Sequence, residues 1–175
     1  MTDPGPRVIL LTGISASGKS TVAQALAERL PRSVHVRGDG FRRMVVRGRA
    51  DMASPPSAEA LRQLRLRHRL TAATADAYCA AGFTVVVQDV VIGPALPAMV
   101  DLITARPLSV VVLAPRPDVV ARREAARAKT GYGNGWSVAQ LDAILRDETP
   151  RLGRWLDNSD QTPDQTVADI LANLV

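Results

Sequence analysis

The feature that most constrains this chain is the octapeptide Gly13-Ile-Ser-Ala-Ser-Gly-Lys-Ser20, which follows an apolar run and precedes a helical pattern. It fits G-x-x-x-x-G-K-[ST], the phosphate-binding P-loop. Glycine at positions 13 and 18 allows backbone angles that residues with a Cβ avoid, so the loop can turn its N–H groups inward around a phosphate. Residues 7–12 predict a buried strand and residues 20–30 a helix, whose positive N-terminal end faces the same phosphates. This order of strand, loop and helix predicts a site for a nucleotide.

Each position of the motif has an expected task. Lys19 is expected to place its charge near the β- and γ-phosphates, and Ser20 to offer its hydroxyl to Mg²⁺. The predicted ATP-binding residues are those of the loop and the start of the helix: Gly13, Ile14, Ser15, Ala16, Ser17, Gly18, Lys19, Ser20 and Thr21. We therefore expect ATP and Mg²⁺ as cofactors.

The composition narrows the class of protein. A chain of 175 residues is expected to form one domain, 1–175, and its hydrophobic content of 46% excludes a disordered chain. We see no signal peptide and no apolar run near the ~20 residues that span a membrane, so a cytoplasmic protein is expected. The single cysteine, Cys79, excludes an internal disulfide and reads as a small core residue. The net charge of +5 permits nucleic-acid binding, but aromatics make up only 3%, so we regard nucleic acid as an unlikely partner. A homo-oligomer is left open.

Hydrophobic runs alternate with helical patterns along the rest of the chain. Further strands are expected at 33–37, 83–88, 108–113 and 154–157, and helices at 58–81, 94–104, 117–129, 137–147 and 162–174. Ser137 and Gln140 are spaced as a capping box. The alternation predicts an α/β fold, a parallel sheet with helices on both faces, and ligands bind such sheets beyond the carboxyl ends of the strands.

Two aspartates follow predicted strands. Asp39 lies between two glycines after the second strand, where a carboxylate could orient an acceptor hydroxyl and take its proton. Asp89 ends the third strand, the position of a Walker B acid that holds Mg²⁺, often through water. The plainer alternatives are a turn-forming residue for Asp39 and a helix cap for Asp89, and the two could exchange roles. Asp39, Asp89 and Arg42 are the predicted substrate-binding residues, and Ser20 and Asp89 the predicted metal ligands.

Arg123 and Arg127 are four residues apart, so they share a helix face. Three glycines follow within 131–135, which suits a lid that closes over ATP, predicted at about 123–136. Arginine there would stabilise charge on the transferring phosphoryl group, so both residues are predicted to be catalytic together with Lys19 and Asp39. The alternative is a solvated helix in which Glu124 neutralises a neighbour.

A second arginine-rich stretch, 61–70, carries four arginines, of which Arg62, Arg65 and Arg69 share a helix face. Such a run is usually a solvated face, and the sharper alternative is a surface for an anionic acceptor or a partner. His68 is expected at the surface.

In these motifs the chain resembles the chloramphenicol phosphotransferase-like family of small P-loop kinases, within the nucleoside-monophosphate-kinase-like superfamily. The P-loop, the apolar strand ending in Asp89-Val90 and the helix Arg123-Glu-Ala-Ala-Arg127 carry the resemblance over nearly the whole chain. It implies a five-stranded sheet of order 2-3-1-4-5, Asp39 as catalytic base, and a small lid. The chain departs from the family at Gln88 and across the acceptor-side insert at about 40–60. Residues 135–142 and Asp157-Asn158 are also similar to the tunicamycin-resistance ATP-binding family.

The resemblance implies transfer of the γ-phosphate of ATP to a hydroxyl of a small molecule, with an antibiotic such as chloramphenicol as one acceptor. The alternatives are a metabolic kinase for a nucleoside, sugar or cofactor precursor, and an ATP-dependent binding protein without productive transfer. An RNA-end kinase that uses the Arg62–Arg69 face is a further rival. The sequence leaves the acceptor and the preference for ATP over GTP open.

Overall fold

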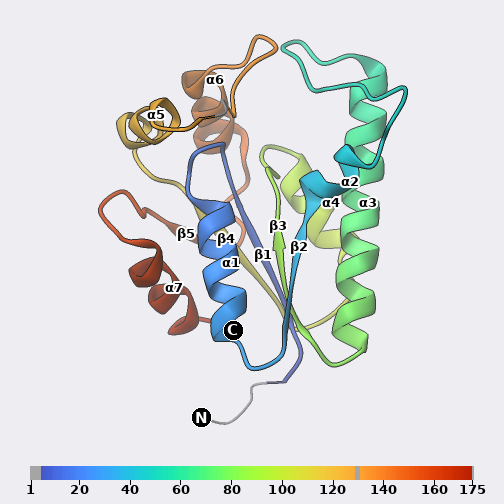
Figure 1. The fold of residues 1–175 in the computed structure, drawn as a ribbon, viewed down its shortest axis with the longest axis vertical. Coiled ribbons are helices and arrows are strands. Elements are labelled where there is room, and N and C mark those ends of the chain that lie inside the picture. The colour runs from blue at the N-terminus through green and yellow to red at the C-terminus, as the bar shows by residue number, and fades with distance from the viewer. Residues whose placement is uncertain (1–4, 129–130, 175) are drawn as a thin grey trace.

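Five strands form one parallel sheet, and helices cover both of its faces (Figure 1). The computed structural model describes residues 5–128 and 131–174. The strands are β1 (Val8–Gly13), β2 (Ser33–Arg37), β3 (Thr84–Gln88), β4 (Leu108–Leu113) and β5 (Arg154–Leu156). The helices are α1 (Lys19–Arg29), α2 (Gly38–Arg43), α3 (Ala58–Ala80), α4 (Ala95–Leu102), α5 (Pro117–Ala125), α6 (Val138–Ala143), the π-helical turn η1 (Ile144–Glu148) and α7 (Pro163–Leu171).

The strand order is β2-β3-β1-β4-β5, and every neighbouring pair is parallel. This confirms the predicted fold class and the predicted order. In the central strand, Leu10 pairs with Val87 of β3 and with Val110 of β4. Because parallel strands end at the same edge, the segments that follow β1, β2, β3 and β5 meet there.

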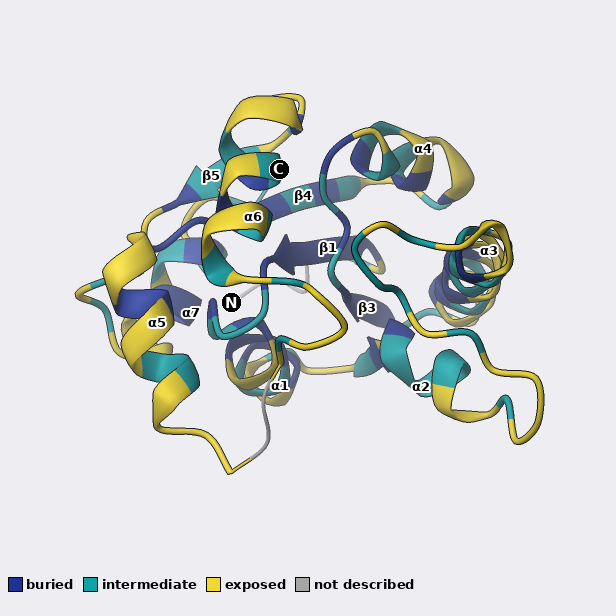
Figure 2. Ribbon diagram, turned by 90° about the horizontal axis from the view of Figure 1, so that it is seen from above, coloured by how far each residue is buried: buried dark blue, intermediate teal, exposed yellow. Residues whose placement is uncertain are grey.

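Successive residues of β1 point to opposite faces of the sheet, and each face has its own apolar core. Val8 and Leu10 belong to the core that α3 and α4 complete, whereas Ile9 and Leu11 belong to the core beneath α1 and α7. Figure 2 looks along the layers and shows the sheet between α1 on one side and α3 and α4 on the other. Burial on both faces explains why the strands read as solid apolar runs instead of alternating patterns.

Several helices end earlier than predicted. α4 occupies 95–102 where 94–104 was expected, α7 ends at Leu171, and α5 ends at Ala125. The predicted end of α5, Lys129, lies outside the described residues. The capping box at Ser137 is confirmed, since its backbone N–H donates to Gln140 Oε1 at 2.8 Å and Gln140 N–H donates to Ser137 Oγ at 3.2 Å. The helix that was expected to run from there to 147 changes into the π-helical turn η1.

Helix α2 was not predicted, because the glycines at 38 and 40 disfavour a helix and the stretch reads as a polar loop. The side chains supply what the backbone lacks. Arg42 Nε and Arg43 Nε donate to the two carboxylate oxygens of Asp39 at 2.8 Å and 2.7 Å, from three and four residues further along the helix. Asp39 therefore lies in the first turn of a helix, where a negative charge is favoured.

One prediction for helix α3, the position of His68, was wrong. His68 was expected at the surface but is only 5% exposed, because it precedes Thr71 and Ala72 by three and four residues and shares their sheet-facing side. Burial lowers the pKa of its imidazole, so it is a neutral core residue. Cys79 is buried on the same helix, as expected. Among the described residues, no helix combines the length and apolarity that a membrane crossing requires.

Candidate active site

The P-loop connects β1 to α1 in a conformation that needs glycine at both ends. Gly13 has φ +148°, and a Cβ there would lie 2.6 Å from the Leu113 carbonyl oxygen and 2.7 Å from Ser17 Oγ. Gly18 caps α1 with φ +96°, in the left-handed region. The Ser17 N–H donates to the Ile14 carbonyl at 3.2 Å and closes the turn between them. The loop is therefore held in a wrapped shape by its own backbone contacts.

Lys19, the first residue of α1, is 7% exposed, and its ammonium donates to the Ile14 carbonyl at 3.0 Å. Burial lowers the pKa of Lys19 to about 8. Asp89 and Asp39 act in the opposite direction, while Arg127 and Arg67 add to the lowering. The charges of the segments around the P-loop thus converge on this one ammonium.

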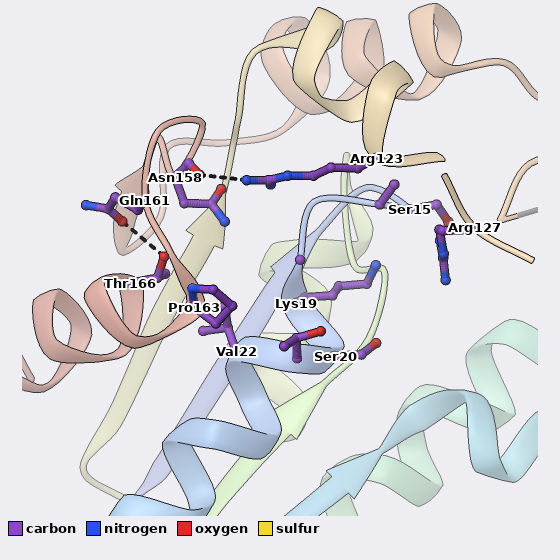
Figure 3. Close-up of a pocket in the computed structure, with 13 residues that line it drawn as sticks. Ser15, Lys19, Ser20, Val22, Arg123, Arg127, Asn158, Gln161, Pro163 and Thr166 are labelled. Atoms are coloured by element: carbon purple, nitrogen blue, oxygen red, sulfur yellow. Dashed lines mark hydrogen bonds between the residues drawn. The ribbon is translucent and has the colours of Figure 1, made fainter. Parts of the chain in front are cut away.

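A pocket of about 370 Å³ opens over the P-loop and the first turn of α1 (Figure 3). Its volume falls in the range of small-molecule sites. At one end lie Ser15, Lys19, Ser20 and Arg127, and at the other lie the residues from the α1 face and the β5–α7 connection: Val22, Asn158, Gln161, Pro163 and Thr166. Ser20 and Thr21, both predicted ATP-binding residues, are exposed along this pocket. The site has a cationic end and an end lined by uncharged side chains, which matches the two ends of a nucleotide.

Arg123, predicted to be catalytic, reaches over the P-loop to the β5–α7 connection (Figure 3). Its guanidinium donates to the Ser17 carbonyl at 3.2 Å and to the Asn158 carbonyl at 2.9 Å. The Asn158 side-chain amide donates to the same Ser17 carbonyl at 3.0 Å. In this structure Arg123 therefore fastens two loops of the pocket together.

Arg127 has different surroundings, although it shares the pocket. Its side chain is 47% exposed, and Nη1 donates to Glu124 Oε2 at 3.2 Å, the neutralising contact that the sequence left open. Because its charge also lowers the pKa of Lys19, it lies toward the phosphate end of the pocket. Of the two arginines, Arg127 has the guanidinium that is placed to meet a ligand.

The glycine-rich segment after α5 rests on the P-loop. Ser15 Oγ donates to the Gly131 carbonyl at 3.1 Å, and the Tyr132 hydroxyl donates to the Ser15 carbonyl at 2.8 Å. The Gly131 N–H in turn donates to Glu124. Residues 129–130 of the predicted lid lie outside the described residues. The described part of this segment is docked on the P-loop, and its closure over ATP stays a prediction.

Asp89, predicted as a metal ligand, is 2% exposed and is held by Arg67 of α3. Arg67 Nε donates to Oδ2 at 2.7 Å, and Nη2 makes a second, very short bond to Oδ1. The Val90 N–H also donates to Oδ1 at 2.7 Å. Gly38, at the start of α2, packs so closely on this carboxylate that a Cβ there would collide with Oδ2. Both oxygens of Asp89 are thus occupied by hydrogen-bond donors.

Asp39, the predicted base, belongs to the same cluster. Besides its bonds to Arg42 and Arg43, its Oδ1 lies 4.0 Å from Nη1 of Arg67. Burial alone would raise the pKa of Asp39, but the hydrogen bonds and charges of Arg42 and Arg43 lower it. Arg42, predicted to bind substrate, also bonds to Asp51. The structure therefore brings together the three predicted acceptor-side residues, all as ion pairs.

Arg67 is the residue that the sequence analysis missed. Arg62, Arg65 and Arg69 are exposed, as expected for a solvated face, but the Arg67 side chain is 13% exposed and points to the strand ends. The available signal was its helical spacing, since it lies three residues after Leu64 and four before the buried Thr71. In the part of the chain that the structure describes, no group of three or more His, Cys, Asp or Glu side chains could hold a metal.

The sequence profile of the AAA domain family (AAA_33) matches residues 8–149. Because the match covers most of the chain, the chain belongs to this family. No protein with a curated description matches the chain in sequence.

Solved structures with the same fold include several kinases. A sugar kinase from Janibacter sp. HTCC2649 superposes with a TM-score of 0.69 at 20% identity, covering 95% of this chain and 93% of its own. The tunicamycin resistance protein of Deinococcus radiodurans gives 0.69 at 16% identity, covering 95% and 94%. The APS kinase of Mycobacterium tuberculosis, in complex with AMPPNP and APS, gives 0.65 at 19% identity, covering 97% of both chains. At these identities the likeness shows the fold, which is that of the P-loop kinases.

Proposed function

We propose that this protein is an ATP-dependent phosphotransferase that moves the γ-phosphoryl group of ATP to a hydroxyl of a small molecule. The observation that carries the proposal is the position of Lys19 between two sets of groups. Arg127 acts on it from the lid side, and Asp39, Asp89 and Arg67 act on it from the ends of β2 and β3 and from α3. A nucleotide pocket and a cluster fit to hold an acceptor therefore meet at one ammonium.

The nucleotide is assigned to the pocket over the P-loop. The N–H groups of Gly13–Thr21 other than that of Ser17 would surround the phosphates, and Lys19 and Arg127 would supply positive charge where negative charge builds up on the transferring group. Arg123 keeps the β5–α7 connection next to the P-loop, so that the adenine base of ATP is held between that connection and Val22. Arg123 is thus a positioning residue here, and Arg127 a catalytic one.

The donor set also fits Mg²⁺. This ion usually keeps several waters and is bound through one or two protein groups plus substrate phosphates, so no protein cage is required. Ser20 lies on the pocket wall with its hydroxyl exposed and is the residue that would hold it directly. Asp89 would contribute through water, because Arg67 occupies both of its oxygens. When bound, the ion neutralises charge on the β- and γ-phosphates.

The acceptor hydroxyl is assigned to Asp39. The oxygen of the acceptor hydroxyl forms a bond to the γ-phosphorus, while the bond from that phosphorus to the β–γ bridging oxygen breaks and ADP leaves. The hydroxyl proton passes to Asp39. A carboxylate of lowered pKa is adequate, because such transfers depend mainly on positioning and charge stabilisation. Arg42 and the Arg67–Asp89 pair fix the carboxylate and the acceptor in place.

The comparisons support a kinase but do not name the acceptor. The Janibacter protein is a sugar kinase, and the Mycobacterium protein is a kinase that binds a nucleotide analogue. From the sequence resemblance we propose a cytoplasmic enzyme whose acceptor is an antibiotic such as chloramphenicol. A metabolic kinase for a nucleoside, sugar or cofactor precursor is the alternative. The tunicamycin resistance protein has the same fold, which keeps a non-catalytic ATP-dependent binder as a third candidate.

The test is mass spectrometry of hydroxyl-bearing compounds incubated with the protein, ATP and Mg²⁺: chloramphenicol, tunicamycin, other antibiotics, nucleosides and sugars. A phosphotransferase adds ~80 Da, the mass of a phosphoryl group, to one class of compound. Asp39→Asn should lower the rate by about 10²–10⁴-fold, the usual contribution of a positioned base, while ATP binding stays unchanged. Asp164→Asn, which removes an exposed carboxylate paired with Arg29 far along the chain, is the matched control.

Two outcomes would contradict the proposal. One is tight ATP binding with no mass gain on any compound, which favours the non-catalytic binder. The other is transfer that Asp39→Asn and Asp164→Asn reduce equally, because Asp39 would then have no special part in the reaction.

A further inference from the structure

The positive charge of this protein is concentrated in one segment. Residues 37–70 contain nine arginines and three acidic residues, a net charge of +6, whereas the whole chain carries +5. The rest of the chain therefore has a net charge of −1, although it contains the P-loop. The excess positive charge of the chain therefore lies outside the P-loop and can attract an anion to residues 37–70.

The same segment encloses an apolar groove of about 70 Å³ between α2, the 44–57 connection and α3. Its apolar walls come from all three: Phe41, Val45, Met52, Leu64, Leu66 and Leu70. Arg42 and Arg67 line its polar end, and these are the side chains that approach Asp39 at 2.8 Å and 4.0 Å. The groove therefore runs up to the proposed catalytic base.

The connection that forms one wall is fixed to α3 by a single glutamine. Gln63 Nε2 donates to the Gly48 carbonyl at 2.8 Å, and the Ala50 N–H donates to Gln63 Oε1 at 2.9 Å. On the opposite wall, Leu66 and Leu70 remain 42% and 41% exposed. Large apolar side chains at the mouth of a preformed groove would gain from being covered by a ligand.

Some arginines of this segment are paired with carboxylates and others are not. Arg43, Arg49 and Arg62 pair with Asp39, Asp51 and Glu59. Arg47, Arg65 and Arg69 make no ion pair with any carboxylate of the described residues.

The helical spacing and the chain order place these cations beside the apolar walls. Arg69 follows Leu66 by three residues and therefore shares its side of α3. Arg47 lies between Val45 and Ala50, which both line the groove. Positive charge thus accompanies the apolar surface.

We propose that the groove and the unpaired arginines bind an amphiphilic anion, which is the acceptor of the phosphotransfer; this inference rests on the proposed phosphotransfer and places an anionic compound ahead of a neutral antibiotic such as chloramphenicol. The hydroxyl lies at Asp39, the apolar body lies in the groove, and a carboxylate, sulfate or phosphate group of the molecule meets Arg69 or Arg47. A sugar would leave its hydroxyls without partners against the apolar walls. A polynucleotide would satisfy the arginines but not the groove.

The first experiment measures binding without nucleotide, using the fluorescence of anilinonaphthalene sulfonate. Two further probes each have one of its features: phenylnaphthylamine, its neutral relative, is apolar without the charge, and inorganic sulfate is charged without the apolar part. The amphiphilic anion should bind more tightly than either, and a non-hydrolysable ATP analogue should not displace it. Leu66→Gln should weaken binding about tenfold, since a contact with a leucine is lost. Arg69→Gln should weaken it roughly threefold, as expected for an exposed charge pair, and high salt should remove that difference.

Two variants on other surfaces are the matched controls. Leu102→Gln changes an exposed leucine of α4, and Arg122→Gln an exposed arginine of α5, and both should leave binding unchanged. Equal binding by all four variants, equal weakening by all four, or displacement of the probe by the nucleotide analogue would overturn the inference.

The second experiment compares phosphoryl transfer to hydroxyalkanoates, to alkanols of matched chain length, to gluconate and to a short RNA. The hydroxyalkanoates should be the best acceptors, and Leu66→Gln should raise their KM. A preference for gluconate, the neutral alkanol or RNA would overturn the inference and leave the phosphotransferase intact. Probe binding that depends on Leu66 and Arg69, with no transfer to any compound, would instead keep the groove as a site for amphiphilic anions and overturn the proposed reaction.

Discussion

The P-loop side and the acceptor side of the site are held by different kinds of contact. Around the P-loop, the contacts run mainly through backbone atoms, such as the carbonyls of Ile14 and Ser17 that hold Lys19, Arg123 and Asn158. At the ends of β2 and β3, the contacts are between charged side chains, with Asp39 and Asp89 held by Arg42 and Arg67. One side offers backbone groups to a phosphate, whereas the other offers a set of ion pairs at the proposed position of the acceptor.

The difference has an electrostatic reason. Two carboxylates beside the triphosphate of ATP would repel it. The arginines at 42, 43 and 67 pair with Asp39 and Asp89 and offset their negative charge next to the P-loop. The P-loop side has no such requirement, because N–H groups and one lysine already complement the phosphates.

Breaking the acceptor-side pair should have the largest effect. Arg67→Met removes the partner of Asp89, which is 2% exposed, and should lower the free energy of unfolding by about 3–5 kcal/mol, the usual cost of leaving a buried charge unpaired. Urea unfolding measures this. The double variant Arg67→Met/Asp89→Leu should recover much of that stability but not the phosphoryl transfer.

A double variant as unstable as Arg67→Met alone would mean that Arg67 stabilises α3 by packing and not by pairing with Asp89. Recovery of transfer in the double variant would show that the ion pair has no part in placing the acceptor.

A second comparison uses two glycines of α2. A Cβ at Gly38 would collide with Asp89 Oδ2, whereas a Cβ at Gly40 would meet no heavy atom within 4 Å. Gly38→Ala should therefore cost about 1–3 kcal/mol, as overpacking does, and lower the rate of transfer. Gly40→Ala should be neutral or stabilise the protein by about 0.5–1 kcal/mol, because alanine loses less backbone entropy in a helix. Thermal unfolding of the pair checks both, and equal melting temperatures would contradict the close packing of Gly38 on Asp89.

The same division explains what could be predicted from the sequence. The P-loop was predictable because its residues are consecutive and its contacts are local, and the strand order followed from a family resemblance that the sheet confirms. The pairing of Arg67 with Asp89 was not, because the two residues are 22 positions apart and the run around Arg67 reads as a solvated face. Helix α2 was missed for a related reason. Its glycines predict a loop, and the helix depends on the pairing of the Asp39 side chain with those of Arg42 and Arg43. Local backbone geometry can be read from a motif, whereas partners of charged side chains depend on the tertiary fold.

The pH dependence of ATP binding should distinguish the P-loop side of the site from the acceptor side, through a change in ATP affinity of about tenfold. Burial lowers the pKa of Lys19 to about 8, so the ammonium loses its proton as the pH rises through that value. A bound phosphate favours the protonated form, so ATP affinity should fall about tenfold between pH 7 and pH 9. The stability of the protein without ATP should change in the opposite direction and rise with pH over the alkaline range. The folded pKa lies below the value of ~10.4 in an unfolded chain, so unfolding becomes less favourable as the pH rises between the two.

Calorimetric titration with ATP from pH 7 to pH 9 measures the first trend. Lys19→Arg is the control, because arginine keeps its charge over this range and should give a nearly flat profile. Equal slopes for the two proteins would assign the titration to a group other than Lys19. Asp39, whose pKa is lowered, is ionised throughout this range and should add no slope.

The smallest expected effect is at the contact between the lid segment and the P-loop. Tyr132→Phe removes the hydrogen bond from the tyrosine hydroxyl to the Ser15 carbonyl, 2.8 Å long, and keeps the ring. A single neutral hydrogen bond contributes about 0.5–1.5 kcal/mol, so the KM for ATP should rise by only about two- to tenfold. The acceptor side should not respond, because Tyr132 touches the phosphate loop and none of the ion pairs of Asp39 or Asp89. Steady-state kinetics with both substrates varied distinguishes the two sides: an increase in the acceptor KM equal to that for ATP would show that the lid couples them.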